Sequence, residues 1–141
     1  MDSINTRKRL EADLSELKRM IFRMGRMSGE ALEKAVWALK NKDMAAAQWV
    51  LDNDDTIDDL EDRIDNACME FAARYQPLGE DLRAVTSLMH IAVDIERIGD
   101  YGSNIAKVAI ELADKDPIKP LIDVPNMVEK ITRMLDVSLT A

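Results

Sequence analysis

Two pairs of acidic residues in this chain have the spacing needed to hold one cation. Glu96 and Asp100 are four residues apart, as are Asp54 and Asp58, and each pair falls in a segment with a helical pattern. Residues four apart lie on the same face of a helix, so each pair can direct two carboxylates to one place. Together the pairs would offer four oxygen donors, which suit Mg²⁺, Ca²⁺, Mn²⁺ or iron better than a cysteine-type zinc site does.

The segment around the upstream pair is unusually acidic, and two interpretations of it stay open. Asp54, Asp58, Glu61 and Asp65 fall in one narrow stripe, and each pair of like charges four residues apart destabilises a helix by about 0.2–0.5 kcal/mol. A bound cation would compensate for this repulsion. The alternative, which the periodicity alone favours, is a solvated acidic face partly neutralised by basic residues of the first helix. The basic residues available for this are Arg19, Arg23 and Arg26.

Gly99, between the two acids of the downstream pair, is costly at a mid-helix position. Glycine there is about 1 kcal/mol less favourable than alanine. Its presence predicts the close approach of another backbone or of a bound group. Ordinary packing of a helix against a small residue is the alternative explanation.

The chain lacks the residue patterns that support catalysis. His90 is the single histidine, and Ser87 rather than glutamate lies three residues before it, so the Glu-x-x-His pattern of di-iron enzymes is missing. Cys68 lies at core spacing and is predicted to be a small apolar filler. The sequence contains no phosphate-binding glycine loop and no nucleophile–base group. We therefore expect a protein that is not an enzyme.

Three long amphipathic segments are predicted to position the acidic pairs. The first has a strict 4-3 alternation of apolar and small residues, which is typical of a helix packed almost parallel to its neighbours. This seam consists of Leu10, Leu14, Leu17, Ile21, Met24, Ser28, Ala31, Ala35 and Ala38. Because its residues become smaller toward Ala38, we expect neighbouring helices to approach more closely at that end.

Two breaks separate the three segments. The run 41–43 predicts a turn and an N-cap, and the run 76–79, which contains Pro77 and Gly79, ends the second helix. The second and third helices are therefore expected at about 44–75 and 81–112. Their predicted core residues are Trp49, Val50, Ile57, Leu60, Ile64, Ala67 and Phe71, then Leu88, Ile91, Ile95, Ile98, Ile105, Ala109 and Leu112. The expected fold class is all-α, an antiparallel three-helix bundle with an additional partial C-terminal helix.

Composition limits the class of protein further. The 141 residues are 47% apolar, enough for one domain with a core, and the net charge of −8 argues against nucleic acid as a partner. A lone cysteine excludes a disulfide framework within the chain. No apolar run reaches the roughly 18 residues needed to span a bilayer, and no signal peptide pattern is present. We expect a cytoplasmic protein without direct membrane insertion.

The domain organisation is predicted to be a bundle at residues 1–115, a linker at 116–125 and a further helical segment at 126–141. This last segment echoes the first helix, because the string ITRM at 131–134 matches IFRM at 21–24. The echo predicts the first part of a second, truncated repeat. An independent C-terminal helix that covers an open side of the bundle is the alternative.

Several motifs occur in the order seen in one known family. The strings are DDTIDDLE at 54–61, QPLGEDLR at 76–83, DIERIGDY at 94–101 and NIA at 104–106. Together they resemble the PhoU family of phosphate-signalling regulators over roughly residues 10–115. The resemblance implies a fold of tandem three-helix bundles, which agrees with the bundle and the echo described above.

The resemblance also implies a function. PhoU proteins are negative regulators of phosphate uptake and of the phosphate-starvation response, and they link the ATPase subunit of a phosphate ABC transporter to a sensor histidine kinase at the inner membrane. Their metal-binding motifs correspond here to Asp54 with Asp58 and to Glu96 with Asp100. Iron, manganese, magnesium and zinc are the candidate ions. The alternative is a metal-free structural bundle for protein–protein contact. Apolar surface left exposed on a lone bundle predicts a homo-oligomer.

Overall fold

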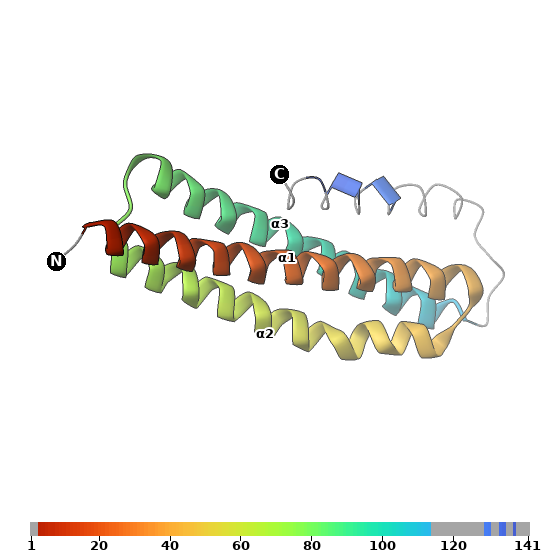
Figure 1. Cartoon of the computed structure of the whole chain (residues 1–141). Coiled ribbons are helices and arrows are strands. Elements are labelled where there is room, and N and C mark those ends of the chain that lie inside the picture. The colour runs from red at the N-terminus through yellow and green to blue at the C-terminus, as the bar shows by residue number, and fades with distance from the viewer. Residues whose placement is uncertain (1–2, 114–128, 131–132, 135–136, 138–141) are drawn as a thin grey trace.

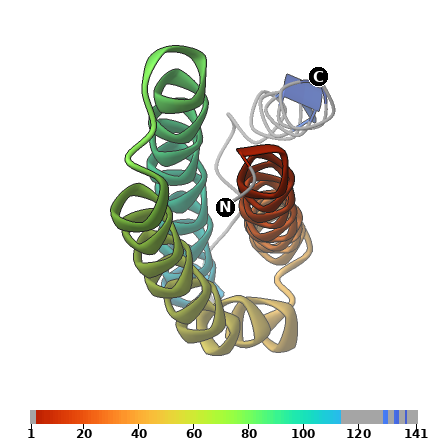
Figure 2. The same cartoon turned by 60° about the vertical axis from the view of Figure 1, so that its left-hand side comes forward.

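Three long helices account for most of the chain. The computed structural model describes residues 3–113 together with 129–130, 133–134 and 137 (Figure 1). Helix α1 covers Ser3–Asn41, α2 covers Met44–Tyr75 and α3 covers Gly79–Glu111, and no strand occurs among the described residues. Successive helices run in opposite directions and lie side by side, as both views show (Figure 2). The prediction of an all-α three-helix bundle is confirmed.

The two turns lie where the sequence predicts them. Asp43 is the N-cap of α2, and its side chain accepts a hydrogen bond of 3.1 Å from the backbone N–H of Ala46. This satisfies one of the donors that a helix start leaves free. Helix α2 ends with Gln76 in the left-handed conformation, φ 43°, where its N–H donates to the Ala72 carbonyl. Gly79 then starts α3 with φ 58°, a conformation that glycine adopts without steric cost.

The seam of α1 forms the centre of the core, as predicted. Ile21, Met24 and Ala35 are fully buried, and only Leu14 of the nine seam residues is half-buried. Helix α2 contributes its apolar stripe and also buries Cys68, which confirms the prediction for that residue. The buried residues of α2 are Ala47, Val50, Ile57, Leu60, Ile64, Cys68 and Phe71. Trp49 and Ala67, predicted as core, pack against its edge.

Helix α3 presents a different face to the core from the one its isoleucines predict. Ile95, Leu88 and Ala109 are buried as expected, whereas the other predicted core residues of this helix are half-buried. Those half-buried residues are Ile91, Ile98, Ile105 and Leu112. The buried face consists instead mainly of small residues, namely Val85, Ala92, Gly99, Gly102, Ser103 and Ala106.

Close contact between α1 and α3 explains why α3 is rotated about its axis, away from the orientation that its isoleucines predict. A Cβ atom added at Gly102 would lie 3.2–3.3 Å from backbone atoms of Ala31 and Leu32. The two backbones can come this near only where both helices carry small residues. The burial of α3 therefore follows its glycine, serine and alanine positions. The contact falls in the part of α1 where the seam becomes small, which confirms the expected close approach.

The opposite end of the bundle carries polar links between helices. Arg7 of α1 donates to Asp81 of α3 at 2.7 Å, and Asp13 of α1 accepts hydrogen bonds from Arg74 at 3.2 Å and from Tyr75 at 2.5 Å. The arginines in these pairs are largely exposed, so each ion pair contributes only about 0–1 kcal/mol. These links fix the relative positions of the helix ends more than they stabilise the fold.

The predicted linker at 116–125 and most of the predicted repeat start at 126–141 lie outside the described residues. Within the part that is described, Arg133 pairs with Glu129 at 3.3 Å on one helical face. The domain boundaries stay predictions. None of the described helices combines the length and the apolar character that a membrane crossing needs.

Candidate metal centre

The structure brings the two predicted acidic pairs together on neighbouring faces of α2 and α3. Asp54 and Glu96 are half-buried, and Asp58 and Asp100 are exposed. Although Asp58 is exposed, nearby protein atoms displace part of the water around its carboxylate, which raises its pKa, and the negative charges of Asp54 and Asp100 raise it further. The pKa of Asp58 on α2 is thus raised by a charge on α3, and the pKa of Glu96 on α3 is raised by charges on α2. The four carboxylates therefore form one acidic face.

Glu96 carries the strongest effect of this crowding. Its carboxyl forms a hydrogen bond with Asp100, one turn further along α3, and this bond is the main reason that its pKa rises from 4.5 to about 7. Partial burial and the negative charge of Glu61 add to the rise. Near neutral pH, Glu96 therefore keeps its proton for a large fraction of the time, and the pair shares one negative charge.

Asp54 is positioned by a contact across the helix interface. The hydroxyl of Ser103 on α3 donates to its carboxylate Oδ1 at 2.9 Å. Ser103 is buried, so this hydrogen bond is protected from competing water. The bond orients one carboxylate of α2 toward α3 and joins the acidic face to the close-packed contact around Gly102.

Glu61 is a fifth member of the face that the predicted set of four does not include. Partial burial raises its pKa, as do the charges of Asp65 and Asp58. Its position three residues after Asp58, in the acidic stripe of α2, is the sequence signal that points to it. Which carboxylates face α3 depends on how α2 and α3 pack, and spacing within one helix does not contain that information.

Basic residues of α1 do not neutralise this face. Arg19 pairs with Glu16 of its own helix at 3.1 Å, and Arg26 lies over the ring of Phe22. Among the described residues, no ion pair joins Arg23 or any other base to the acids between α2 and α3. The alternative of a solvated acidic face included partial neutralisation by the arginines of α1. The described residues show no such ion pair.

The carboxylates are near one another without forming a ready-made cage. Within the described part of the chain, no three histidine, cysteine, aspartate or glutamate side chains converge closely enough to hold one ion. Gly99 is explained by packing, since a Cβ there would lie 3.3 Å from the Ser28 hydroxyl of α1. That hydroxyl is fully buried and has no hydrogen-bond partner among the described residues. The glycine thus makes room for the Ser28 side chain of α1.

The raised pKa of Glu96 predicts how stability depends on pH. The folded protein holds a proton that the unfolded chain loses above about pH 4.5, so this stabilisation is present at low pH and is lost as pH rises through about 7. Glu96→Gln copies the protonated form, and we expect it to match the wild type near pH 5. At about pH 8 it should be more stable by roughly 1–3 kcal/mol, allowing for solvent screening. Urea unfolding at both pH values measures the difference, and an equal gain at both would contradict it.

The fold and the site define the chain as an all-α bundle with a carboxylate-rich surface shared by two of its helices. The sequence profile of the PhoU domain matches residues 21–109. The chain belongs to the PhoU family.

Individual relatives agree with this assignment. The chain is 37% identical over 131 residues to the phosphate-specific transport system accessory protein PhoU homolog of Aquifex aeolicus (strain VF5), covering 93% of this chain and 59% of that protein. It is 33% identical over 115 residues to PhoU of Escherichia coli (strain K12), covering 79% and 48%. The crystal structure of PhoU from Pseudomonas aeruginosa superposes with a TM-score of 0.85 at 32% identity, covering 93% and 63%. The chain thus spans about half to two thirds of the length of these relatives.

Proposed function

We propose that this chain acts in the regulation of phosphate transport, as a negative regulator of phosphate uptake and of phosphate-starvation signalling. Its membership of the PhoU family carries this proposal, because the relatives in that family are named as accessory proteins of a phosphate-specific transport system. The proposed partners are the ATPase subunit of the transporter and a sensor histidine kinase. We propose an adaptor role at the cytoplasmic side of the membrane and no catalytic activity of its own.

Complementation tests this role directly. Expression of the chain in a bacterium that lacks its own PhoU protein should lower phosphate-starvation gene expression in phosphate-rich medium. Alkaline phosphatase activity is the readout. Ile95→Ala, which truncates a fully buried core residue and should destabilise the fold, serves as a control for nonspecific effects of overexpression. Unchanged phosphatase activity, with the folded chain detected in the cells, would contradict the proposal.

The second part of the proposal is that the acidic face between α2 and α3 binds a metal ion. The donors fit a hard divalent or trivalent cation, because they are carboxylate oxygens supported by the Ser103 hydroxyl. Asp54 and Asp58 would hold the ion from α2, and Glu96 and Asp100 from α3. A bound ion would neutralise the crowded charges and link the two helices, and small side-chain rotations would be needed to bring the carboxylates onto it.

Metal binding by the purified protein tests this site. We expect protein prepared without chelator to contain metal by elemental analysis, and Mn²⁺ to bind in calorimetric titration. Glu96→Gln and Asp58→Asn should each weaken Mn²⁺ binding by at least about tenfold, since even the supporting partners of metal ligands are worth about 10–100-fold. Glu111→Gln is the matched control, because Glu111 is an exposed acid at the far end of α3.

A metal-free structural bundle is the second candidate function, and one observation favours it. The Glu96–Asp100 hydrogen bond lets a proton lower the negative charge of the face without any ion. Under this reading the wild type contains no metal, and the three variants behave alike in the titration. Those two results would support the structural bundle and remove the metal site.

The proposal includes a homo-oligomer. Several large apolar side chains are exposed along α3, with Val93 at 51% and Tyr101 at 57%. The others on this helix are Leu82, Met89, Val108 and Ile110. Where exposed apolar side chains adjoin one another, they commonly mark a protein–protein contact. Sedimentation of the titration samples, at several protein concentrations, gives the mass, and a monomer at every concentration would contradict the oligomer.

A further inference from the structure

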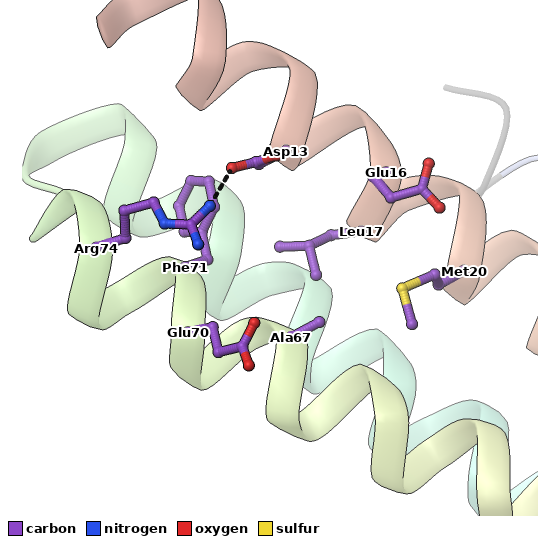
Figure 3. A pocket seen from close by; sticks show the side chains of 8 residues that line it. All are labelled: Asp13, Glu16, Leu17, Met20, Ala67, Glu70, Phe71 and Arg74. Atoms are coloured by element: carbon purple, nitrogen blue, oxygen red, sulfur yellow. Dashed lines mark hydrogen bonds and ion pairs between the residues drawn. The ribbon is translucent and has the colours of Figure 1, made fainter.

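A small pocket opens between α1 and α2 (Figure 3), whereas the acidic face lies between α2 and α3. Its volume is about 130 Å³. Leu17 and Phe71, both 3% exposed, form its floor, and Met20 and Ala67 contribute its half-buried walls. The pocket is therefore an apolar hollow of side-chain size at the protein surface.

Three acidic side chains and the guanidinium of Arg74 surround this apolar floor (Figure 3). Glu16 of α1 and Glu70 of α2 line the pocket from its two sides (Figure 3). Asp13 closes one end, but its charge is compensated by Arg74 at 3.2 Å and by the Tyr75 hydroxyl at 2.5 Å. The negative charge that stays available is therefore that of the two glutamates.

Neither glutamate has a strong partner among the residues that the structure describes. Within that part of the chain, Glu16 pairs only with Arg19, at 3.1 Å, and the two side chains are 58% and 77% exposed. Such a surface pair is worth about 0–1 kcal/mol and exchanges readily. Among the described residues, Glu70 takes part in no ion pair. An incoming cation would thus find two carboxylates without first having to break a stable contact.

We propose that this pocket binds the side chain of an arginine or lysine on a basic segment of a partner protein. Such a side chain has an aliphatic stem that can cover Leu17 and Phe71 while its charged end stays at the rim, between Glu16 and Glu70. A purely apolar side chain would use the floor but not the charge, and an acidic one would be repelled. The net charge of −8 also attracts basic partners over a longer range.

The adjacent hollow does not have this selectivity. It is larger, about 470 Å³, and lies beyond the Asp13–Arg74 pair toward the start of α1. Arg9 and Arg74 line it together with Asp13, so its bases outnumber its acids. Arg74 also borders the acid-rimmed pocket, but there it faces the three acids Asp13, Glu16 and Glu70. The acid-rimmed pocket is the part of the groove that can distinguish a basic side chain from others. Its action does not depend on metal at the face between α2 and α3.

Titration with small probes of defined charge tests the proposal on the full chain. The probe is N-acetyl-arginine methylamide, and the readout is the NMR shift of the Leu17 and Met20 methyl groups. We expect a saturable shift, with N-acetyl-citrulline methylamide and N-acetyl-norleucine methylamide binding roughly two- to fivefold more weakly. The citrulline probe has nearly the same shape as arginine without the charge. The norleucine probe retains only the aliphatic stem.

Charge removal at the rim gives the matched test. Glu70→Gln should clearly lower the preference for arginine over citrulline, because Glu16 alone then supplies the charge, while Glu111→Gln should leave it unchanged. Both side chains are exposed, so both variants should keep the wild-type fold. The proposal is overturned if no methyl shift saturates, if citrulline or norleucine binds as well as arginine, or if Glu70→Gln keeps the preference. Methyl shifts that depend on protein concentration without any probe would mean that a second copy of the chain fills the pocket, which also overturns it.

Discussion

Replacing Ile95 by alanine should destabilise the bundle by about 2–5 kcal/mol, the range for large apolar side chains truncated in a well-packed core. Ile95 lies on the buried face of α3 and is 0% exposed. Truncation removes buried apolar atoms and leaves a cavity that the three long helices cannot easily close. Urea unfolding followed by circular dichroism measures the free energy of unfolding.

Val93→Ala is the matched control for this measurement. Val93 is two residues earlier on the same helix and is 51% exposed, so in the monomer, at low protein concentration, its truncation should change stability by no more than about 0.5 kcal/mol. Both substitutions replace a β-branched residue by alanine, so both change helix propensity in a similar way. The difference between their free energies of unfolding therefore measures the effect of burial. A similar loss in both variants would mean that the buried face of α3 is not the one described.

Replacing Gly102 by valine should cost about 1–3 kcal/mol or more, because the added side chain meets backbone that cannot move aside. The nearest atoms to an added Cβ are the backbone N of Leu32 and the carbonyl carbon of Ala31, at 3.2–3.3 Å. Helix α3 would have to move away from α1. Ser103, the next residue, would move with it, so we also expect its hydrogen bond to Asp54 to weaken.

Gly29→Ala, at another helical glycine, should have the opposite effect and stabilise the protein. Nothing lies within 4 Å of a Cβ added there, so alanine should stabilise the helix by up to about 1 kcal/mol through its higher propensity. Thermal unfolding of the two variants compares them under one set of conditions. If both variants gained stability, the tight contact of α1 with α3 at Gly102 would be refuted.

The parts of the fold that local signals determine were predictable from the sequence. The N-cap at Asp43 and the break at Pro77 and Gly79 each follow from the chemistry of a few adjacent residues, and α2 begins and ends where they require. The α1 seam could be predicted equally well, because its 4-3 alternation of apolar and small residues indicates one continuous contact along the helix.

The face that α3 buries was not predictable in the same way. A pattern of isoleucines suggests burial by hydrophobicity, yet Ile98 is half-buried and Gly102 lies in the interface. Close helix approach depends on the volumes of residues on both helices at once. A pattern within one helix contains only half of that information.

The candidate metal site was likewise predictable from the sequence only in part. The pairs Asp54 with Asp58 and Glu96 with Asp100 follow from spacing alone. Their meeting across α2 and α3, and the hydroxyl that Ser103 adds, depend on the rotation of α3 that the small residues impose. The site could therefore be predicted as two half-sites, and its composition required the packed structure.

The change of residue size along α1 gives the two ends of the bundle different kinds of stability. Around Gly102 the helices are held by short-range packing, which salt barely affects. Around Arg7 and Asp13 they are linked by exposed ion pairs, which salt screens over a Debye length of about 10 Å at 0.1 M. Local unfolding should therefore start where α1 begins and should spread more readily at high salt. Such fraying would open the groove between α1 and α2 while the face between α2 and α3 stayed closed, so the two surfaces can exchange with solvent as independent units.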